Sequence, residues 1–229
     1  MNQVILVIPA FNEEKNIQAV VENLIRNYPE LDYVVINDGS TDSTEEILRK
    51  NGYNHICLPV NLGLAGCFQT GMKYAYEKGY SCAVQFDGDG QHRPEFVAGM
   101  KAKLDEGYSI VIGSRFVEGK KDFSPRMLGS RPIGLAVWLT TGVRVADPTS
   151  GMRMFDREMM QKFAYHLNYG PEPDTVSFLI KQGARVAEVP VVIDERQGGE
   201  SYLKPMVAAK YMLRMLTSIL VIQNFRTRR

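Results

Sequence analysis

Two carboxylates stand one residue apart in the stretch QFDGDGQHRPE, which covers residues 85–95. Asp87 and Asp89 follow the apolar run CAVQF, and Pro94 comes next at a position typical of a first helical turn. Like charges this close repel each other, and both lose hydration if the apolar run is an interior strand. Oxygen ligands suit hard cations, so the stretch predicts Mg²⁺ or Mn²⁺ held by Asp87 and Asp89 with Gln91.

The stretch from residue 85 to 95 is also compatible with other structures. A plain surface turn is the simplest, because Asp-Gly pairs are common in turns. An EF-hand calcium loop is nearly excluded, since its sixth position should be glycine and is His92 here. No G-x-G-x-x-G motif follows the first apolar run, and no G-x-x-x-x-G-K-[ST] motif occurs in the sequence. If a nucleotide binds, the cation and the edge of a sheet must therefore hold its diphosphate.

The elements that would position these carboxylates can be read from the hydrophobic pattern. In the first half of the chain, short β-branched runs alternate with helical spacing, which predicts a largely parallel α/β sheet flanked by helices. The predicted strands are residues 4–8, 33–37, 55–58, 82–86 and 109–113, and the predicted helices follow from 17, 38, 65 and 94. Ligands of such sheets bind beyond the carboxyl ends of the strands, where residues 11–13, 38 and 87–91 fall.

The pattern is looser after Gly113. Residues 114–131 are predicted to form a long basic loop. The prediction for the rest of the chain begins with a helix through Trp138 and the stretch 147–155. It continues with a helix near 174–181, a strand at 185–193, a loop, and a helix at about 206–225. We expect a single domain over residues 1–203 with a C-terminal amphipathic helix in residues 204–229.

The composition narrows the class of protein. Apolar residues make up 45% and charged residues 23% of the 229 residues, as in ordinary globular proteins. The formal net charge of +1 argues against a nucleic-acid partner. The three cysteines form no C-x-x-C pair, which indicates a reducing compartment and neither a disulfide framework nor a zinc site. No apolar run is long enough to predict a membrane span, and the N-terminus resembles a strand more than a signal peptide.

Several stretches, in order along residues 2–203, carry a resemblance to a known family. They are VIPAFNEEKNI, VINDGSTDST, NLGLAGCFQTGMKYA, QFDGDGQHRPE, IGSRF, DPTSGMRMF and EVPVVIDERQGGESYL. The chain resembles the family-two glycosyltransferases of the GT-A fold, above all the dolichyl- and polyprenyl-phosphate sugar synthases and their bacterial cell-wall polysaccharide relatives. One position departs from the family pattern, because the second motif usually begins Asp-Asp-Gly-Ser and Asn37 replaces its first acid; Asp38 is retained.

The resemblance implies a metal-dependent, inverting transfer of a sugar in cell-surface polysaccharide synthesis. The donor would be a UDP-, GDP- or TDP-sugar, and the acceptor a polyprenyl phosphate or a lipid-linked glycan. Asp89 and Gln91 would bind Mg²⁺ or Mn²⁺, and Asp87 would also face the sugar and ribose. A sugar nucleotidyltransferase and a non-catalytic nucleotide-sugar-binding protein are the alternatives.

The resemblance also implies the substrate-binding residues. The nucleoside pocket would be lined by Pro9, Phe11, Asn12, Glu13 and Asp38. The phosphates would be bound by Arg115, by Arg126 with Ser130, and by Arg196; we add Arg131 because it adjoins Ser130. Ser201 lies in a loop whose small residues suit closure over product or acceptor.

The catalytic base is left open. A sugar hydroxyl acceptor needs a carboxylate to take its proton, and Asp147, Glu172 and Asp174 are the candidates. A lipid phosphate is already an anionic nucleophile and hardly needs a base, so arginines such as Arg126 would do more to bring the two anions together.

The C-terminal segment predicts where the enzyme works. It contains no acid from residue 204 onward, and its basic residues are Lys204, Lys210, Arg214, Arg226, Arg228 and Arg229. A helix here would have a basic face and an apolar face with Met212, Leu216, Ile219 and Leu220. We expect a cytoplasmic enzyme that binds the anionic inner face of the cytoplasmic membrane through this helix. A homo-oligomer contact is the main rival for the apolar face.

Overall fold

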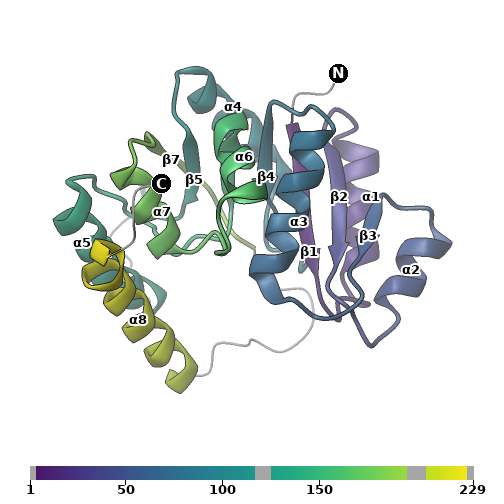
Figure 1. Cartoon of the computed structure of the whole chain (residues 1–229). Coiled ribbons are helices and arrows are strands. Elements are labelled where there is room, and N and C mark those ends of the chain that lie inside the picture. Colours follow the sequence, from purple (N-terminus) through teal and green to yellow (C-terminus); the bar gives the residue numbers. More distant parts are fainter. Residues whose placement is uncertain (1–3, 117–124, 195–204, 226–229) are drawn as a thin grey trace.

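The computed structural model describes residues 4–116, 125–194 and 205–225, and its centre is a seven-stranded sheet (Figure 1). The strand order is β3-β2-β1-β4-β6-β5-β7. The strands are β1 Val4–Ala10, β2 Asp32–Asn37, β3 His55–Cys57, β4 Cys82–Gln85, β5 Ile110–Ser114, β6 Arg153–Asp156 and β7 Val186–Pro190.

Most strand pairs are parallel, as the alternation of strands and helices predicts. β1 pairs in parallel with β2 and β4, β2 with β3, and β5 with β7. The exception is β6, which lies antiparallel between β4 and β5. This strand was not predicted, because its four residues include a charged side chain, Arg153, which the fold buries. The sheet is therefore mixed at its centre, and residues that precede β6 lie at the carboxyl edge of its neighbours.

Helices cover both faces of the sheet (Figure 1). β1 shows why, since its side chains alternate between two apolar clusters: Ile5 and Val7 face one, and Leu6 and Ile8 face the other. The helices are α1 Ile17–Asn27, α2 Thr44–Lys50, α3 Gly63–Glu77, α4 Val97–Asp105, α5 Pro125–Thr141, α6 Arg157–Tyr165, α7 Pro173–Lys181 and α8 Pro205–Leu220, with short 3₁₀ turns η1 Pro94–Phe96 and η2 Ile222–Phe225.

Helix α3 lies directly against β1 and sets the position of the site. A Cβ added at Gly71 would lie 2.1 Å from Cγ1 of Val7, so only glycine allows this approach. Phe68 of the same helix packs edge-on against Phe155 and Phe163, with ring centroids 5.4 and 4.9 Å away. The helix therefore joins β1 to β6 and α6 through one apolar core.

The prediction of a long loop over residues 114–131 is wrong in its last part, because α5 begins at Pro125. Gly129, Pro132 and Gly134 suggest a loop in the sequence, and Pro132 lies inside the helix. The apolar residues Ile133, Ala136 and Val137 are buried at helical spacing. Their packing outweighs the poor helix propensity of the segment.

The C-terminal helix was predicted at about 206–225; the structure ends α8 at Leu220 and adds η2. α8 packs against α5 and α7, and Met215 and Ile219 belong to the core that covers one face of the sheet. Polar contacts hold it as well, since the hydroxyl of Ser218 donates to Asp174 at 2.6 Å. Within the described ranges, no helix has the length and apolar character needed to cross a membrane.

Candidate active site

Most of the predicted nucleoside-binding and metal-binding residues gather at one edge of the sheet. β1, β2, β4 and β5 end at this edge, and the antiparallel strand β6 begins there. A pocket of about 310 Å³ opens at the ends of β1, β2 and β4. It is lined by Pro9, Ala10, Phe11, Glu13, Asp38, Leu64, Cys67, Asp87, Gly88 and Asp89. The structure thus brings together most of the predicted nucleoside-binding and metal-binding residues, although they come from three separate stretches of the chain.

One end of the pocket is apolar and contains a single buried carboxylate. Asp38 accepts the backbone N–H groups of Leu62 and Gly63 at 2.7 and 2.9 Å, at the positive end of α3. Burial, with the nearby Asp38 carboxylate as a second cause, raises the pKa of the Cys67 thiol to about 12. The thiol is therefore neutral at physiological pH and acts as a small apolar surface in the same pocket as Phe11. This end suits a flat ring that offers a hydrogen-bond donor.

Asn12 has a different position from the one predicted. Its backbone is in the left-handed region, with φ of 57°, and its side-chain oxygen accepts the N–H of Thr41 at 2.8 Å. Its own N–H donates to the Ser40 hydroxyl at 3.0 Å. Asn12 therefore ties the loop after β1 to the loop after β2 and does not line the pocket.

The other end of the pocket is acidic. Asp87 and Asp89 line it, and an oxygen of Asp89 accepts the N–H of Gln91 at 3.1 Å, which closes a tight turn. The side-chain nitrogen of Gln91 donates to the carbonyl oxygen of Asp194 at 3.0 Å. The Gln91 amide thus directs its nitrogen to the protein, so its oxygen is the end that a cation would bind.

This donor set fits a divalent cation that arrives with a phosphate group. Among the described residues, no three His, Cys, Asp or Glu side chains come together as a metal site. Two carboxylates and one amide oxygen give fewer ligands than Mg²⁺ or Mn²⁺ requires. Mg²⁺ commonly binds through one or two carboxylates and takes its remaining ligands from phosphate oxygens and water. The residues therefore fit a cation shared with a diphosphate.

His92 and Gly151 lie close to the Asp87 carboxylate. The buried His92 accepts the N–H of Asp87 on Nδ1 at 2.9 Å, so a ring hydrogen lies on Nε2, which is 3.5 Å from Oδ2 of Asp87. A Cβ added at Gly151 would lie 2.9 Å from that same oxygen. Sequence reasoning gave neither residue a role; the only signal for His92 was its place directly after the two acids.

Asp147 and Arg115 form an ion pair with each other. Asp147 is fully buried, and its two oxygens accept Nε and Nη2 of Arg115 at 2.6 and 2.7 Å. The N–H of Asp147 donates to Glu188 on β7 at 2.8 Å. The sequence prediction made Asp147 a candidate base and Arg115 a phosphate ligand. The structure differs from it, because both oxygens of Asp147 are engaged and no surface of the carboxylate meets the pocket.

The acids of the PEPD stretch hold α8. Glu172 accepts Nη2 of Arg214 on both oxygens, at 2.7 and 2.8 Å. Burial raises the pKa of Glu172, and Arg214 opposes this shift in part. Asp174 is buried and accepts the Ser218 hydroxyl. Both candidate bases are thus occupied by the C-terminal helix.

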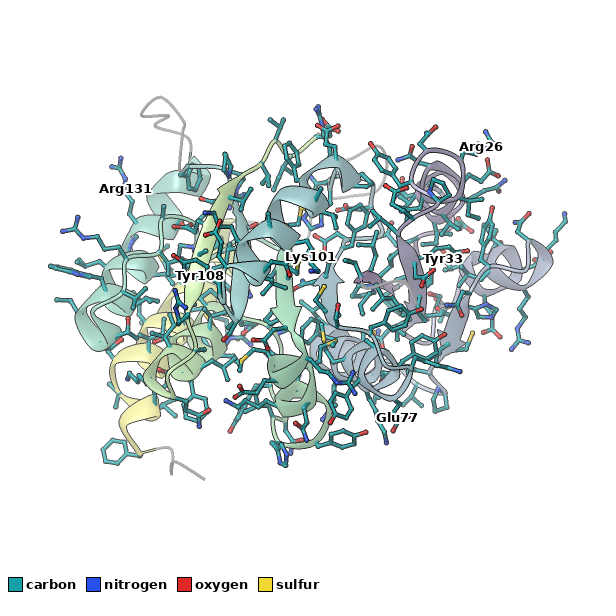
Figure 2. The ribbon with its side chains drawn as sticks, turned by 90° about the horizontal axis from the view of Figure 1, so that it is seen from above. Arg26, Tyr33, Glu77, Lys101, Tyr108 and Arg131 are labelled. Carbon is teal, nitrogen blue, oxygen red and sulfur yellow. The ribbon has the colours of Figure 1, made fainter. Side chains whose placement is uncertain are left out.

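Three of the remaining predicted phosphate-binding residues, Arg126, Ser130 and Arg131, lie in α5. Ser130 is buried in this helix, and Arg131 is exposed on it, far from Arg26 of α1 (Figure 2). Neither lines the pocket. Arg126 belongs to the first turn of α5, and its side chain is outside the described part. Arg196 and Ser201 lie outside the described residues.

The mixed sheet and the helices on both of its faces form a GT-A-like fold. The family model described as "Glycosyl transferase family 2" matches residues 5–163, and the chain belongs to this family.

Named proteins resemble the chain over most of its length. It is 30% identical over 211 residues to the UDP-N-acetylglucosamine–dolichyl-phosphate N-acetylglucosaminyltransferase of Methanococcus voltae, with 81% of this chain and 83% of the relative covered. It is 29% identical over 210 residues to the polyprenol monophosphomannose synthase of Mycolicibacterium smegmatis, with 86% and 79% covered.

A solved structure supports the fold. The structure of glucosyl-3-phosphoglycerate synthase from Mycobacterium tuberculosis with Mn²⁺, UDP-glucose and phosphoglyceric acid matches with a TM-score of 0.72. It is 21% identical, and the match covers 99% of this chain and 81% of that one. At this identity the likeness concerns the fold.

Proposed function

We propose that the protein transfers a sugar from a nucleotide-sugar donor to the phosphate of a polyprenyl or dolichyl carrier, with inversion at the sugar. The observation that carries the proposal is the pocket, which joins an apolar end holding Asp38 to an acidic end holding Asp87 and Asp89. A nucleoside diphosphate sugar has the same order of parts: a ring system, then a negatively charged diphosphate. The names of the two relatives supply the class of acceptor.

Each group of residues has a role in this proposal. Phe11 and Asp38 take the nucleoside, and Asp87, held by His92, faces the ribose and sugar. Asp89 and Gln91, with Asp87, hold Mg²⁺ or Mn²⁺. The cation, when bound, stabilises the charge that develops on the leaving diphosphate.

The ion pairs of the candidate bases favour a phosphate acceptor over a sugar hydroxyl. A hydroxyl must lose a proton as it attacks, so it needs a carboxylate within hydrogen-bond reach. Asp147 and Glu172 are bonded to Arg115 and Arg214 instead. A phosphate monoester is already an anion and needs cations to bring it to the donor. Arg126 and Arg196 remain our proposed ligands for it, with Arg131 and Ser201; Ser130 is buried within α5 and is no longer included.

A panel of donors tests the function directly. Purified protein is incubated with UDP-, GDP- or TDP-sugars and polyprenyl phosphate, with Mn²⁺ or Mg²⁺ and again with a chelator. We expect mass spectrometry to show a polyprenyl-phosphate sugar with one donor class, and only when the metal is present. Full activity in chelator would remove the metal from the proposal. Pyrophosphate with nucleotide-sugar formation would indicate a nucleotidyltransferase, and binding without turnover a non-catalytic protein.

We also propose that α5 and α8 bind an anionic membrane surface, at the cytoplasmic face, where a lipid carrier would be reached. The two helices lie side by side (Figure 1). Leu139 on α5 and Leu213 on α8 are 64% and 67% exposed. Lys210 is exposed on the same helix as Leu213, and the acid-free segment continues to Arg229. Exposed leucines beside basic residues suit a lipid interface, since the apolar side chains enter it and the cations meet headgroups.

Vesicle flotation with the full chain tests this surface. Changing both Leu139 and Leu213 to Glu removes the apolar anchors, and each buried leucine contributes about 1.5–3 kcal/mol. The two leucines together contribute about 3 kcal/mol or more, so we expect binding to anionic vesicles to fall by about a hundredfold or more. Ile25→Glu is the control, because Ile25 is 49% exposed on α1. Equal flotation of all three proteins contradicts the proposal. Loss of a dimer in light scattering, without a change in flotation, assigns the surface to an oligomer.

A further inference from the structure

The segment that follows β7 is bonded to the loop that carries the proposed cation ligands. The N–H of Asp194 donates to the carbonyl oxygen of Gln91 at 3.0 Å, and the side-chain nitrogen of Gln91 donates back to the carbonyl oxygen of Asp194 at 3.0 Å. Beside this reciprocal pair, Nε and Nη2 of Arg93 donate to the two carboxylate oxygens of Asp194 at 2.8 and 2.5 Å. Asp194 is thus bound through its backbone and its side chain.

These bonds decide which end of the Gln91 amide is presented to a cation. A backbone carbonyl oxygen can only accept, so the atom of Gln91 that faces Asp194 must be the amide nitrogen. The amide oxygen then lies at the opposite corner of the group. A divalent cation binds the oxygen and is repelled by the NH₂ group, so a flipped or freely rotating amide would be a poor ligand.

The Arg93–Asp194 pair has the geometry to hold this orientation. Both partners of a guanidinium–carboxylate fork are fixed in plane and direction, which a single hydrogen bond does not achieve. The side chains are 39% and 41% exposed, and exposed pairs contribute little to global stability. Arg93 also pairs with Glu95 of η1, at 3.6 Å. Because the Arg93–Asp194 ion pair contributes little to the free energy of unfolding, its main effect is on the local orientation of Asp194 and Gln91.

We propose that Arg93 and Asp194 are positioning residues that fix the Gln91 amide as a cation ligand. The inference rests on the proposed function, namely that a divalent cation binds at Asp87, Asp89 and Gln91. Arg93 holds the Asp194 carboxylate, Asp194 holds the Gln91 nitrogen, and the Gln91 oxygen is thereby directed to the cation. Partners of metal ligands commonly change metal affinity about 10–100-fold when they are replaced.

Direct measurement of Mn²⁺ binding tests the inference. Free Mn²⁺ is titrated by electron paramagnetic resonance against the full chain, with UDP present, for wild type and Arg93→Gln. We expect binding about tenfold weaker in the variant, with turnover recovering toward wild type at saturating Mn²⁺. Lys103→Gln is the matched control, because it breaks an exposed pair with Glu106 whose side chains are 40% and 52% exposed. The unfolding midpoints of the two variants should change equally.

Two further variants keep the result interpretable. Arg93→Lys retains the charge and loses the fork, so it should also weaken Mn²⁺ binding, and it serves if Arg93→Gln does not fold. Exchange of the pair, Arg93→Asp with Asp194→Arg, should restore part of the affinity that Arg93→Asp loses.

Asp89→Ala separates this inference from the proposed function. If Asp89→Ala binds Mn²⁺ as wild type does, the cation site itself is wrong. If Asp89→Ala loses binding while Arg93→Gln and Arg93→Lys stay within twofold of wild type, the positioning role alone is overturned.

Discussion

Replacing Asp89 by alanine is expected to lower kcat/KM for sugar transfer by about a thousandfold while leaving the fold intact. Asp89 lines the acidic end of the pocket, and the proposed cation would lose one of its two carboxylate ligands. Stabilisation of a leaving group by a metal lowers the activation free energy by several kcal/mol, and each step of about 1.4 kcal/mol changes the rate tenfold. The measurement is the rate of formation of the lipid-linked sugar at a fixed, high Mn²⁺ concentration, with urea unfolding of the same samples.

Asp105→Ala is the matched control for this prediction. Asp105 is an exposed acid that ends α4 and pairs only with Lys101 among the described contacts. Both variants remove one negative charge, so a general change in net charge would affect them equally. We expect Asp105→Ala to retain wild-type kcat/KM. If Asp89→Ala stays within tenfold of wild type, Asp89 is not a ligand of a catalytic cation.

The parallel part of the fold could be predicted because its signals are local. Runs such as VILVI are covered on both faces, and the continuous apolar pattern reports this directly. β6 could not be predicted in this way, since its partners β4 and β5 are far away in the sequence and its Arg153 carries the wrong polarity for an interior strand. The start of α5 was missed for a related reason: the packing of Ile133 and Val137 outweighs Pro132.

In the candidate site, too, some features have a local signal in the sequence and others depend on tertiary contacts. Residues that follow parallel strands, such as Phe11, Asp38 and Asp87, must meet at one edge, and they do line one pocket. The partners of single side chains depend on tertiary structure instead. Asn12 bonds to Thr41, and Gly151 reaches Asp87 because an antiparallel strand follows it. Neither contact has a local signal in the sequence.

The second large effect is expected at Arg115, where the sequence predicted a phosphate ligand and the structure places an ion pair. Arg115→Ala leaves Asp147 buried without its charged partner, and breaking a buried pair in this way typically costs about 3–5 kcal/mol. The Arg115 side chain is 21% exposed, so water can reach the gap and the low end of that range applies. We expect urea unfolding to show a loss of about 3 kcal/mol in the free energy of unfolding.

A double variant decides between the two roles of Arg115. In Arg115→Ala with Asp147→Asn, no unpaired charge is buried, and the Thr149 hydroxyl, 3.2 Å from Asp147, can still bond to the amide. Most of the lost stability should therefore return, while activity stays low if Arg115 also binds phosphate. If Arg115→Ala is as stable as wild type and only its KM rises, the pair contributes nothing to folding and Arg115 is a substrate ligand alone. If stability and activity both return in the double variant, Arg115 acts only through Asp147, and the acceptor phosphate must be held by other cations.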